Sequence, residues 1–177
     1  MLSHVFTRTG DDGNTYCNLL KTRVPKDHPI IELIGTLDEA NSFIGLARSF
    51  IPSYMSDVGN DLKDLQYLTF RIGFHVSGIN SLKEEDVKKL EELADKYYGK
   101  APLKNFILPA GPQPSAALHV ARTIVRRAER DLIKASRVYK FDDIVFKTIN
   151  RLSSVLFAMA VYISKEMGYP EEPVSFR

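Results

Sequence analysis

Two arginines and a glutamate recur at helical spacing in the segment ALHVARTIVRRAERDLI. Arg122, Arg126 and Glu129 fall on one edge of a helix, beside an apolar stripe, because residues at i, i+4 and i+7 share a face. Each guanidinium offers a planar fork of N–H donors that suits phosphate oxygens. Arg127 points away from this edge. The pattern therefore indicates an anion site for a phosphate-bearing ligand.

Two other predicted helices carry polar groups on faces that a helix bundle should bury. Asp38 falls on the same face as Ile34, with Asn41 one turn on, and Asn150 lies inside the most apolar helix of the chain. Taken singly, such features also fit a buried ion pair, an exposed i, i+4 ladder, or a hydrogen bond that fixes helix register. Because buried charges are costly, their presence on three helices together favours a ligand site.

The stretch TGDDG near the N-terminus allows two interpretations. Its Asp-Gly pair suits the corner of a hairpin between residues 5–6 and 15–16. Its glycines and the neighbouring threonine hydroxyls also suit a nest of N–H groups around phosphates. The spacing fits neither an EF-hand nor a P-loop. From the residues alone, the turn is favoured.

Five segments with helical periodicity would position these groups, and little strand is predicted. They cover about residues 30–51, 53–77, 81–99 and 115–136, and from a break near 139–143 to about 167. Ser81 and Glu84 have the spacing of a capping box at the start of the third segment. A proline-rich loop with Phe106 at its apolar centre precedes the fourth. We expect an all-α, ferritin-like up-and-down bundle of five helices.

Composition narrows the class of protein. With 177 residues, 44% of them hydrophobic, the chain can bury one core, so we expect a single domain. A net charge of +2 gives no global field for nucleic acid or acidic membranes. Cys17 is the only cysteine, no signal peptide is recognised, and the longest apolar run, residues 155–163, is far below the about 20 residues of a membrane span. We expect a cytoplasmic protein with neither nucleic-acid nor membrane partners.

Six blocks of the sequence read TRTGDDGNT, RVPKDHP, GTLDEANSFIGLAR, FILPAG, ALHVARTIVRRAER and INRLSSVLF. In this order, and over nearly the whole chain, they resemble the PduO-type ATP:cob(I)alamin adenosyltransferases. The resemblance implies a five-helix bundle that assembles as a homotrimer, with ATP and the corrinoid meeting at each subunit interface. It also implies the reaction, in which cob(I)alamin attacks the 5′ carbon of ATP, with Mg²⁺ on the nucleotide, to give adenosylcobalamin and triphosphate.

The resemblance further implies roles for the catalytic residues. Arg122 and Arg126 correspond to a central pair, one held by Asp38 across the subunit interface and one reaching the triphosphate. Phe106 corresponds to the side chain that presses on the lower face of the corrin, where it excludes the lower axial ligand and makes the cobalt easier to reduce. Asn41 is the second residue expected to contact the cobalamin.

The same resemblance divides the chain into a flap over ATP (residues 1–29), the helix bundle (30–167) and a tail (168–177). Glu129 and Asn150 correspond to the neighbourhood of ATP and magnesium, and Glu129 is the candidate metal contact. The residues implied to bind ATP are Thr7, Arg8, Thr9, Gly10, Asp11, Gly13, Thr15, Lys26, Arg126, Glu129 and Asn150.

Several positions depart from the family pattern. The flap continues with YCNLL in place of a glycine-containing stretch, Ser154 stands at an often acidic position, residues 73–79 diverge, and Phe176 replaces a tryptophan. None of these touches the arginine pair.

Three classes of function were weighed. The leading one is the adenosyltransferase, which would work with a cobalamin reductase and an adenosylcobalamin-dependent enzyme. A non-catalytic nucleotide or corrinoid carrier or sensor of the same fold is the alternative. A basic nucleic-acid module is disfavoured, because the arginines abut an apolar stripe and no basic face interleaved with aromatic residues occurs.

Overall fold

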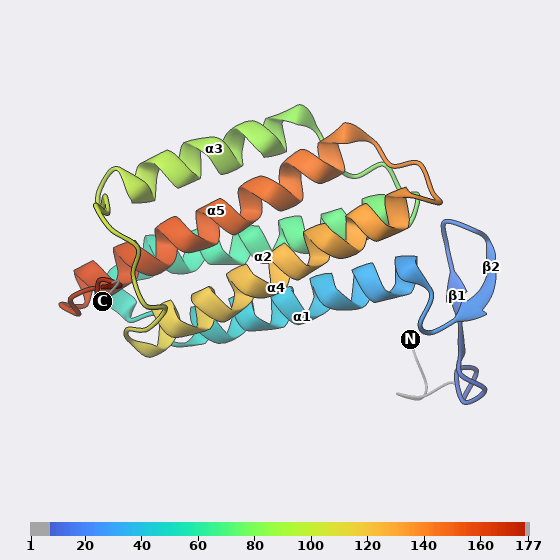
Figure 1. Ribbon diagram of the computed structural model, residues 1–177, viewed down its shortest axis with the longest axis horizontal. Helices are drawn as coiled ribbons and strands as arrows, with labels where there is room; N and C mark the ends of the chain where they lie inside the picture. Colours follow the sequence, from blue (N-terminus) through green and yellow to red (C-terminus); the bar gives the residue numbers. More distant parts are fainter. Residues whose placement is uncertain (1–7, 176–177) are drawn as a thin grey trace.

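The computed structural model describes residues 8–175, which form five helices and a two-stranded hairpin at one end of the molecule (Figure 1). The predicted helices are confirmed, with ends that differ by only a few residues. They are α1 (Pro29–Ser49), α2 (Ser56–Val76), α3 (Glu84–Tyr98), α4 (Gln113–Ser136) and α5 (Asp143–Glu166), and a short 3-10 turn (Ser53–Met55) precedes α2.

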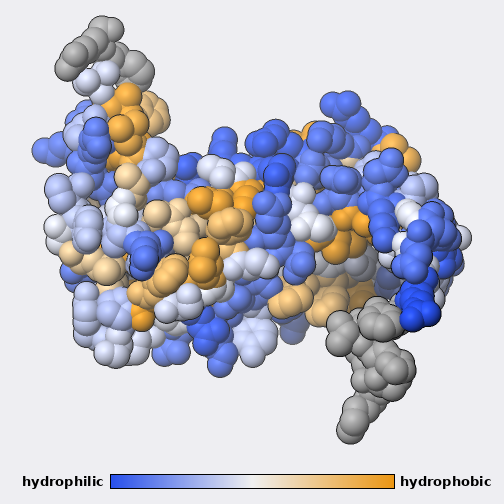
Figure 2. Space-filling view, turned by 90° about the horizontal axis from the view of Figure 1, so that it is seen from below, coloured by the Kyte–Doolittle hydropathy of each residue, from blue (hydrophilic) through white to orange (hydrophobic). Residues whose placement is uncertain are grey.

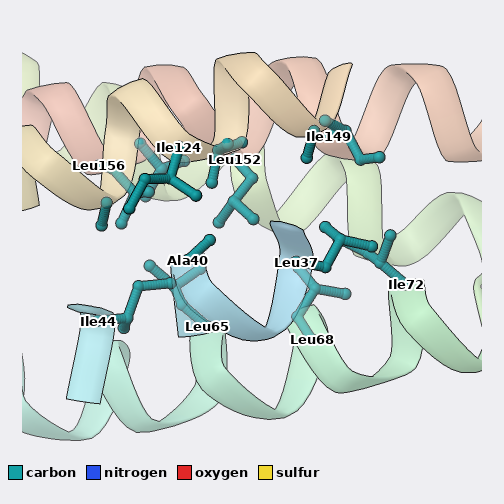
Figure 3. Packing of buried hydrophobic residues seen from close by; sticks show 14 of the residues in the cluster. Leu37, Ala40, Ile44, Leu65, Leu68, Ile72, Ile124, Ile149, Leu152 and Leu156 are labelled. Carbon is teal, nitrogen blue, oxygen red and sulfur yellow. The ribbon is translucent and has the colours of Figure 1, made fainter. Parts of the chain in front are cut away.

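Consecutive helices run antiparallel, as predicted (Figure 1). α1 packs against α2 and α4, α4 packs against α5, and α3 covers the outer side of α5. Apolar side chains from α1, α2, α4 and α5 interdigitate in the core (Figure 3). Leu152 of α5 is fully buried there, so truncating it to alanine should cost about 2–5 kcal/mol.

The start of α1 is fixed by His28, which precedes Pro29 at the first helical position. Its Nδ1 accepts a hydrogen bond from the Ile30 N–H at 3.3 Å, which satisfies one free donor of the first turn. Its Nε2 is hydrogen-bonded to the Tyr139 hydroxyl at 2.8 Å. The residue therefore joins the start of α1 to the connection between α4 and α5.

The hairpin differs from the one expected. Strand β1 (Asn14–Cys17) pairs antiparallel with β2 (Thr22–Pro25), and the chain turns at residues 18–21. TGDDG forms a turn directly before β1 and is not the corner of this hairpin. The predicted pairing of residues 5–6 with 15–16 lies outside the described residues, so that corner stays a prediction. In the turn between β1 and β2, Leu19 and Leu20 pack against the helical core, and their burial holds the hairpin to the bundle.

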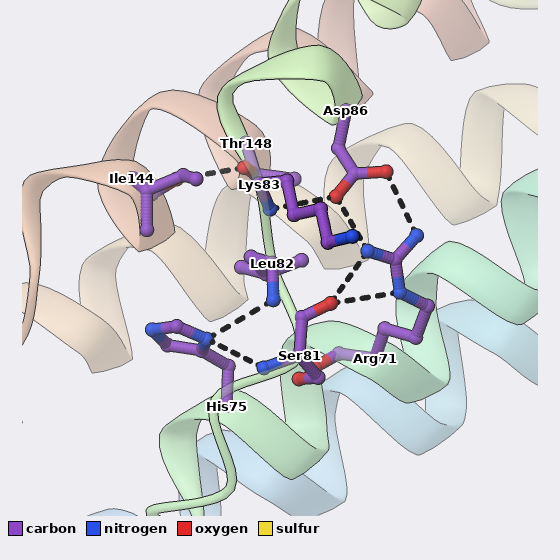
Figure 4. A network of polar contacts seen from close by, with 8 residues as sticks. All are labelled: Arg71, His75, Ser81, Leu82, Lys83, Asp86, Ile144 and Thr148. Carbon is purple, nitrogen blue, oxygen red and sulfur yellow. Dashed lines mark hydrogen bonds and ion pairs between the residues drawn. The ribbon is translucent and has the colours of Figure 1, made fainter.

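The predicted capping box of Ser81 and Glu84 at the start of α3 was wrong (Figure 4). Lys83 precedes the helix, and its N–H donates to Oδ2 of Asp86 at 2.8 Å. Ser81 instead donates from Oγ to the Arg71 carbonyl at 2.6 Å, and its own carbonyl accepts from Arg71 Nε at 2.8 Å. The Arg71 guanidinium then reaches Asp86, with Nη1 2.7 Å from Oδ1. Ser81, which the sequence assigned to the helix cap, is therefore hydrogen-bonded to Arg71 of α2 instead.

α5 is long and apolar enough, by length and composition alone, to cross a membrane. In the fold, 61% of its most apolar window is buried inside the bundle. The position of α5 against α2, α3 and α4 accounts for this composition.

Candidate functional site

A cavity of about 1010 Å³ lies between α3, α4, α5 and the loop of residues 103–109. Arg122 and Arg126, one turn apart on α4, form part of one wall. Phe106 lies in the loop that forms another wall. The cavity is also lined by His119 of α4, by Ser153, Ser154 and Phe157 of α5, and by Val174 of the C-terminal segment.

The two arginines carry unpaired positive charge. The Arg122 guanidinium lies 5.8 Å from the centre of the Phe157 ring, and its Nε is buried with no hydrogen-bond partner within residues 8–175. Burial, and secondarily the charge of Arg126, lowers the pKa of Arg122, yet an arginine remains charged at physiological pH. The exposed Arg126 side chain makes no hydrogen bond or ion pair in this part of the chain either. Two cations without counter-ions on one wall attract an anion.

Glu129 and Asn150 meet between α4 and α5. Asn150 donates from Nδ2 to Glu129 Oε1 at 2.9 Å, and its Oδ1 accepts from Arg151 Nη1 at 2.8 Å. Both side chains are half-buried and neither lines the cavity. Arg127 points away from the arginine edge, as predicted, and pairs with Glu39 of α1.

Phe106 is 80% exposed, but its backbone is held in place. The Val174 N–H donates to the Phe106 carbonyl at 2.8 Å, and the Leu108 N–H donates to the Glu172 carbonyl at 2.9 Å. Between them, Ile107 and Pro173 form an antiparallel bridge. The C-terminal segment therefore fixes the loop while the aromatic ring stays open to a ligand. The sequence held no strand pattern that would have revealed this pairing.

Asp38 and Asn41 of α1 do not join the cavity. The expectation that Asp38 lies on a buried face is wrong for the single chain, where it is exposed and its carboxylate has no partner among residues 8–175. Helical periodicity places it beside the apolar stripe, but the stripe that α1 buries ends short of it. Asn41 is buried, and its Oδ1 lacks a partner in the same part of the chain.

The flap residues lie at the hairpin end of the molecule, and none of them lines the cavity (Figure 1). These are Arg8, Thr9, Gly10, Asp11, Gly13, Thr15 and Lys26, whereas Thr7 and Phe176 lie outside the described residues. Arg23 organises the turn, donating from Nη2 to the Thr9 carbonyl and to Asp12 Oδ1, both at 2.7 Å. The Asn14 N–H lowers the pKa of Asp12, desolvation opposes it, and the charge of Arg23 lowers it further, so the net shift is downward. Asp12 thus serves the turn itself.

His119 was missed by the sequence reasoning. It is 3% exposed, and both ring nitrogens are buried with no partner within residues 8–175. Its ring lies 6.1 Å from that of Phe157, centre to centre. Burial, with a smaller effect of the Arg122 charge, lowers the pKa of His119 to about 4, so the imidazole is neutral at physiological pH. The signal available in the sequence was its place one turn before Arg122 on the same helix.

The family model for cobalamin adenosyltransferase matches residues 5–163. The corrinoid adenosyltransferase of Bacillus subtilis is 36% identical over 186 residues, spanning 98% of this chain and 95% of that protein. The corrinoid adenosyltransferase MMAB of Homo sapiens is 33% identical over 180 residues, spanning 95% of this chain and 72% of that protein.

Solved structures are similar over the same length. A variant of the PduO-type ATP:corrinoid adenosyltransferase from Lactobacillus reuteri, complexed with cobalamin and ATP, has a TM-score of 0.90 and 34% identity, and the match covers 98% of this chain and 100% of that chain. Another variant of that enzyme, complexed with ATP, has a TM-score of 0.89 at 34% identity, covering 97% and 100%. In sequence and in fold, this chain belongs to the cobalamin adenosyltransferase family.

Proposed function

We propose that the protein transfers the 5′-deoxyadenosyl group of ATP to cob(I)alamin. The electron pair of Co(I) attacks the 5′ carbon, a cobalt–carbon bond forms, the bond from that carbon to oxygen breaks, and triphosphate leaves. The observation that carries this proposal is the cavity itself, where an exposed aromatic ring and two arginines without an acidic partner in residues 8–175 line one space. Such a space suits a large flat ligand next to an anionic one.

The arginines would act on the leaving group. Negative charge develops on triphosphate as the bond to the 5′ carbon breaks, and preorganised cations stabilise charge that grows in the transition state. Arg126, exposed and unpaired, is the residue proposed to bind the triphosphate. Arg122, held over Phe157, would stay close to the reacting atoms. No general base is required, because the nucleophile is the substrate's own metal.

Phe106 would contact the lower face of the corrin. Its ring is exposed while hydrogen bonds from the C-terminal segment hold its backbone, so an apolar surface is presented at a defined place. An apolar group in that position keeps a lower axial ligand away from the cobalt. Without that ligand, Co(II) is more easily reduced to the nucleophilic Co(I).

We further propose that the working form is a homotrimer with sites between subunits. Asp38 and the described part of the flap, residues 8–29, do not line the cavity of the arginines in their own chain, so the partner's copies would complete each site. α1 supplies a surface for this contact, with Phe43 half-buried and Leu46 exposed, and Figure 2 shows hydrophobic patches on the face seen from the α1 side.

Mixing two inactive variants tests this assembly. Asp38→Ala and Arg122→Ala, unfolded and refolded together, should regain activity in about one site of three in each mixed trimer, because one interface then has both wild-type residues. Each variant refolded alone is the control. Mixed trimers that stay as inactive as the controls would show that both residues act within one chain.

Magnesium would enter as the ATP complex. Within residues 8–175 no group of three or more His, Cys, Asp or Glu side chains could hold a metal ion. Mg²⁺ commonly keeps several waters and binds through substrate phosphates and one or two carboxylates, and Glu129 is our candidate. We also propose a cytoplasmic location, and a cobalamin reductase and an adenosylcobalamin-dependent enzyme as partners.

An anaerobic assay tests the reaction. Protein, Mg-ATP and chemically reduced cobalamin are mixed, and the spectral change of cobalt–carbon bond formation is followed against a protein-free control. We expect ATP-dependent product. Binding of ATP and corrinoid without product would instead identify a carrier or sensor of the same fold.

A further inference from the structure

We propose that His119 binds a carboxamide group on the periphery of the corrinoid and so orients the ring in the cavity. This inference rests on the proposed function and assigns a polar contact to a residue of the cavity wall that the proposed function does not use.

Unpaired buried atoms concentrate on one turn of α4. Five buried side-chain nitrogen or oxygen atoms within residues 8–175 have no hydrogen-bond partner. Three of them are His119 Nδ1, His119 Nε2 and Arg122 Nε, and both residues line the cavity. Buried polar atoms in folded proteins nearly always have partners, because leaving one unpaired is costly. A cluster of such atoms beside a ligand cavity indicates that a ligand supplies the partners.

The other two histidines of the bundle show what a structural role looks like in this chain. His28 caps α1 and is hydrogen-bonded to Tyr139. His75 Nδ1 accepts from the N–H groups of Ser81 and Leu82, and its Nε2 lies 3.3 Å from an Asp142 oxygen (Figure 4 shows the Nδ1 contacts). Both rings have partners on both nitrogens. Within residues 8–175, His119 has a partner on neither nitrogen, so this part of the chain does not account for its imidazole.

The protonation state selects the chemical class of the ligand group. A neutral imidazole has one N–H donor and one acceptor nitrogen. Phosphate oxygens would satisfy only the donor, whereas a primary carboxamide offers both an acceptor oxygen and a donor NH₂. The corrin ring carries several such carboxamides on its edge. Arg122 Nε–H, one turn on, is a further donor for the amide oxygen.

Bringing this contact about needs a small movement. The ring nitrogens are covered in the unliganded chain, so the imidazole must turn about its side-chain bonds toward the cavity that it lines. After this rotation the ring nitrogens would form hydrogen bonds with the ligand, and ligand binding would drive the movement.

Two substitutions separate the contact from packing. His119→Leu removes both polar atoms at similar volume, and His119→Gln keeps one donor and one acceptor. His75→Leu is the matched control, because it removes a buried histidine whose nitrogens are already paired inside the protein. Dissociation constants are measured by absorbance titration with cob(II)alamin and, separately, by calorimetry with Mg-ATP.

We expect His119→Leu to weaken cob(II)alamin binding about tenfold, His119→Gln to restore most of the loss, and ATP affinity to stay within about twofold. The thermal midpoint of the unliganded His119→Leu protein should not fall, because an unpaired polar group has been removed from the interior. His75→Leu should lower the midpoint and leave corrinoid affinity unchanged. Equal losses for ATP and corrinoid, an unchanged corrinoid affinity, or a lowered midpoint in His119→Leu would each overturn the proposal.

A second, independent experiment changes the ligand instead of the protein. Cobalamin hydrolysed at single peripheral amides gives separable monocarboxylic acids. One of these should bind wild type and His119→Leu with nearly equal affinity, because its contacted amide is gone; if wild type keeps its advantage for all of them, the proposal fails. Binding is read without turnover, so wild type that binds corrinoid but forms no adenosylcobalamin would refute the proposed reaction alone.

Discussion

Asn150 of α5 donates a hydrogen bond from Nδ2 to Oε1 of Glu129 on α4, at 2.9 Å. The bond holds the carboxylate one turn beyond Arg126, between two helices that also line the cavity. Because Asn150 takes a second bond from Arg151, its amide orientation is fixed from both ends. Glu129 therefore presents its charge from a defined position.

Glu129→Gln should keep the fold and weaken the use of ATP. The glutamine carbonyl still accepts from Asn150, so we expect a thermal midpoint close to wild type, while the loss of charge next to a magnesium-nucleotide should lower turnover about tenfold or more. Glu84→Gln is the control, since Glu84 also accepts from an α5 side chain, Lys147 Nζ at 3.3 Å, but lies away from the cavity and from Asn150. Wild-type kinetics in Glu129→Gln would reject a role for this charge.

Arg126→Ala should remove most turnover and little stability. The side chain is exposed and unpaired within residues 8–175, so truncation loses few internal contacts, whereas a lost contact to developing charge costs about 10²–10³ in rate. Steady-state kinetics and thermal unfolding measure the two effects. Arg130→Ala, an exposed arginine whose Nη1 donates to the Arg126 carbonyl, serves as control and should stay active. Similar losses in both variants would point to a general effect of charge on α4.

Phe106→Ala should separate reduction from transfer. The ring is 80% exposed, so stability should change little. We expect a larger loss of product when cob(II)alamin must be reduced on the protein than when cob(I)alamin is supplied, because the alanine leaves room for a lower axial ligand. Equal losses in the two assays would contradict that role.

Acid should weaken the attachment of α3 to α2 through Asp86. Burial would raise the pKa of Asp86, but hydrogen bonds from Arg71 and the Lys83 N–H outweigh it, and the net shift is downward. A carboxyl with a lowered folded-state pKa contributes its full stability above its unfolded pKa of about 3.9, and loses it as pH falls through the lower folded value.

Asp86→Asn should therefore be less stable than wild type by about 1–3 kcal/mol at pH 7, with the gap closing as pH falls below about 4. Thermal unfolding followed by circular dichroism from pH 7 to acid pH measures the gap. Lys88→Ala is a control, because Lys88 and Glu92 form an exposed ion pair that contributes little to the free energy of unfolding. A gap that does not narrow in acid would show that the carboxylate charge is not what stabilises the loop.

The helices could be predicted because each buries one apolar stripe, and apolar residues must then recur in the sequence with a period of about 3.6 residues. The errors arose where partners distant in the sequence intervene. Ser81, the serine of the predicted capping box, donates to the carbonyl of Arg71 on α2 instead of capping α3. Leu19 and Leu20 pack against the helical core from the turn of a hairpin that the sequence did not predict. No local pattern in the sequence marks either contact.

The site divides in the same way. Arg122 and Arg126 lie one turn apart on the same helix, so the sequence alone could predict that their side chains share one face. The C-terminal segment that fixes Phe106, and the unpaired state of His119, depend on contacts between elements and could not be read from spacing.

By itself, the sequence determined five amphipathic helices, an edge of arginine side chains suited to an anion and a set of motifs that identify the family, because these depend on residue type and local period. Tertiary structure alone decided which side chains share the cavity, that Asp38 and residues 8–29 of the flap stay outside it in one chain, and that His119 has no partner within residues 8–175. The physical reason is that burial and hydrogen-bond pairing depend on which helices pack together, and a helix does not carry that information in its own sequence.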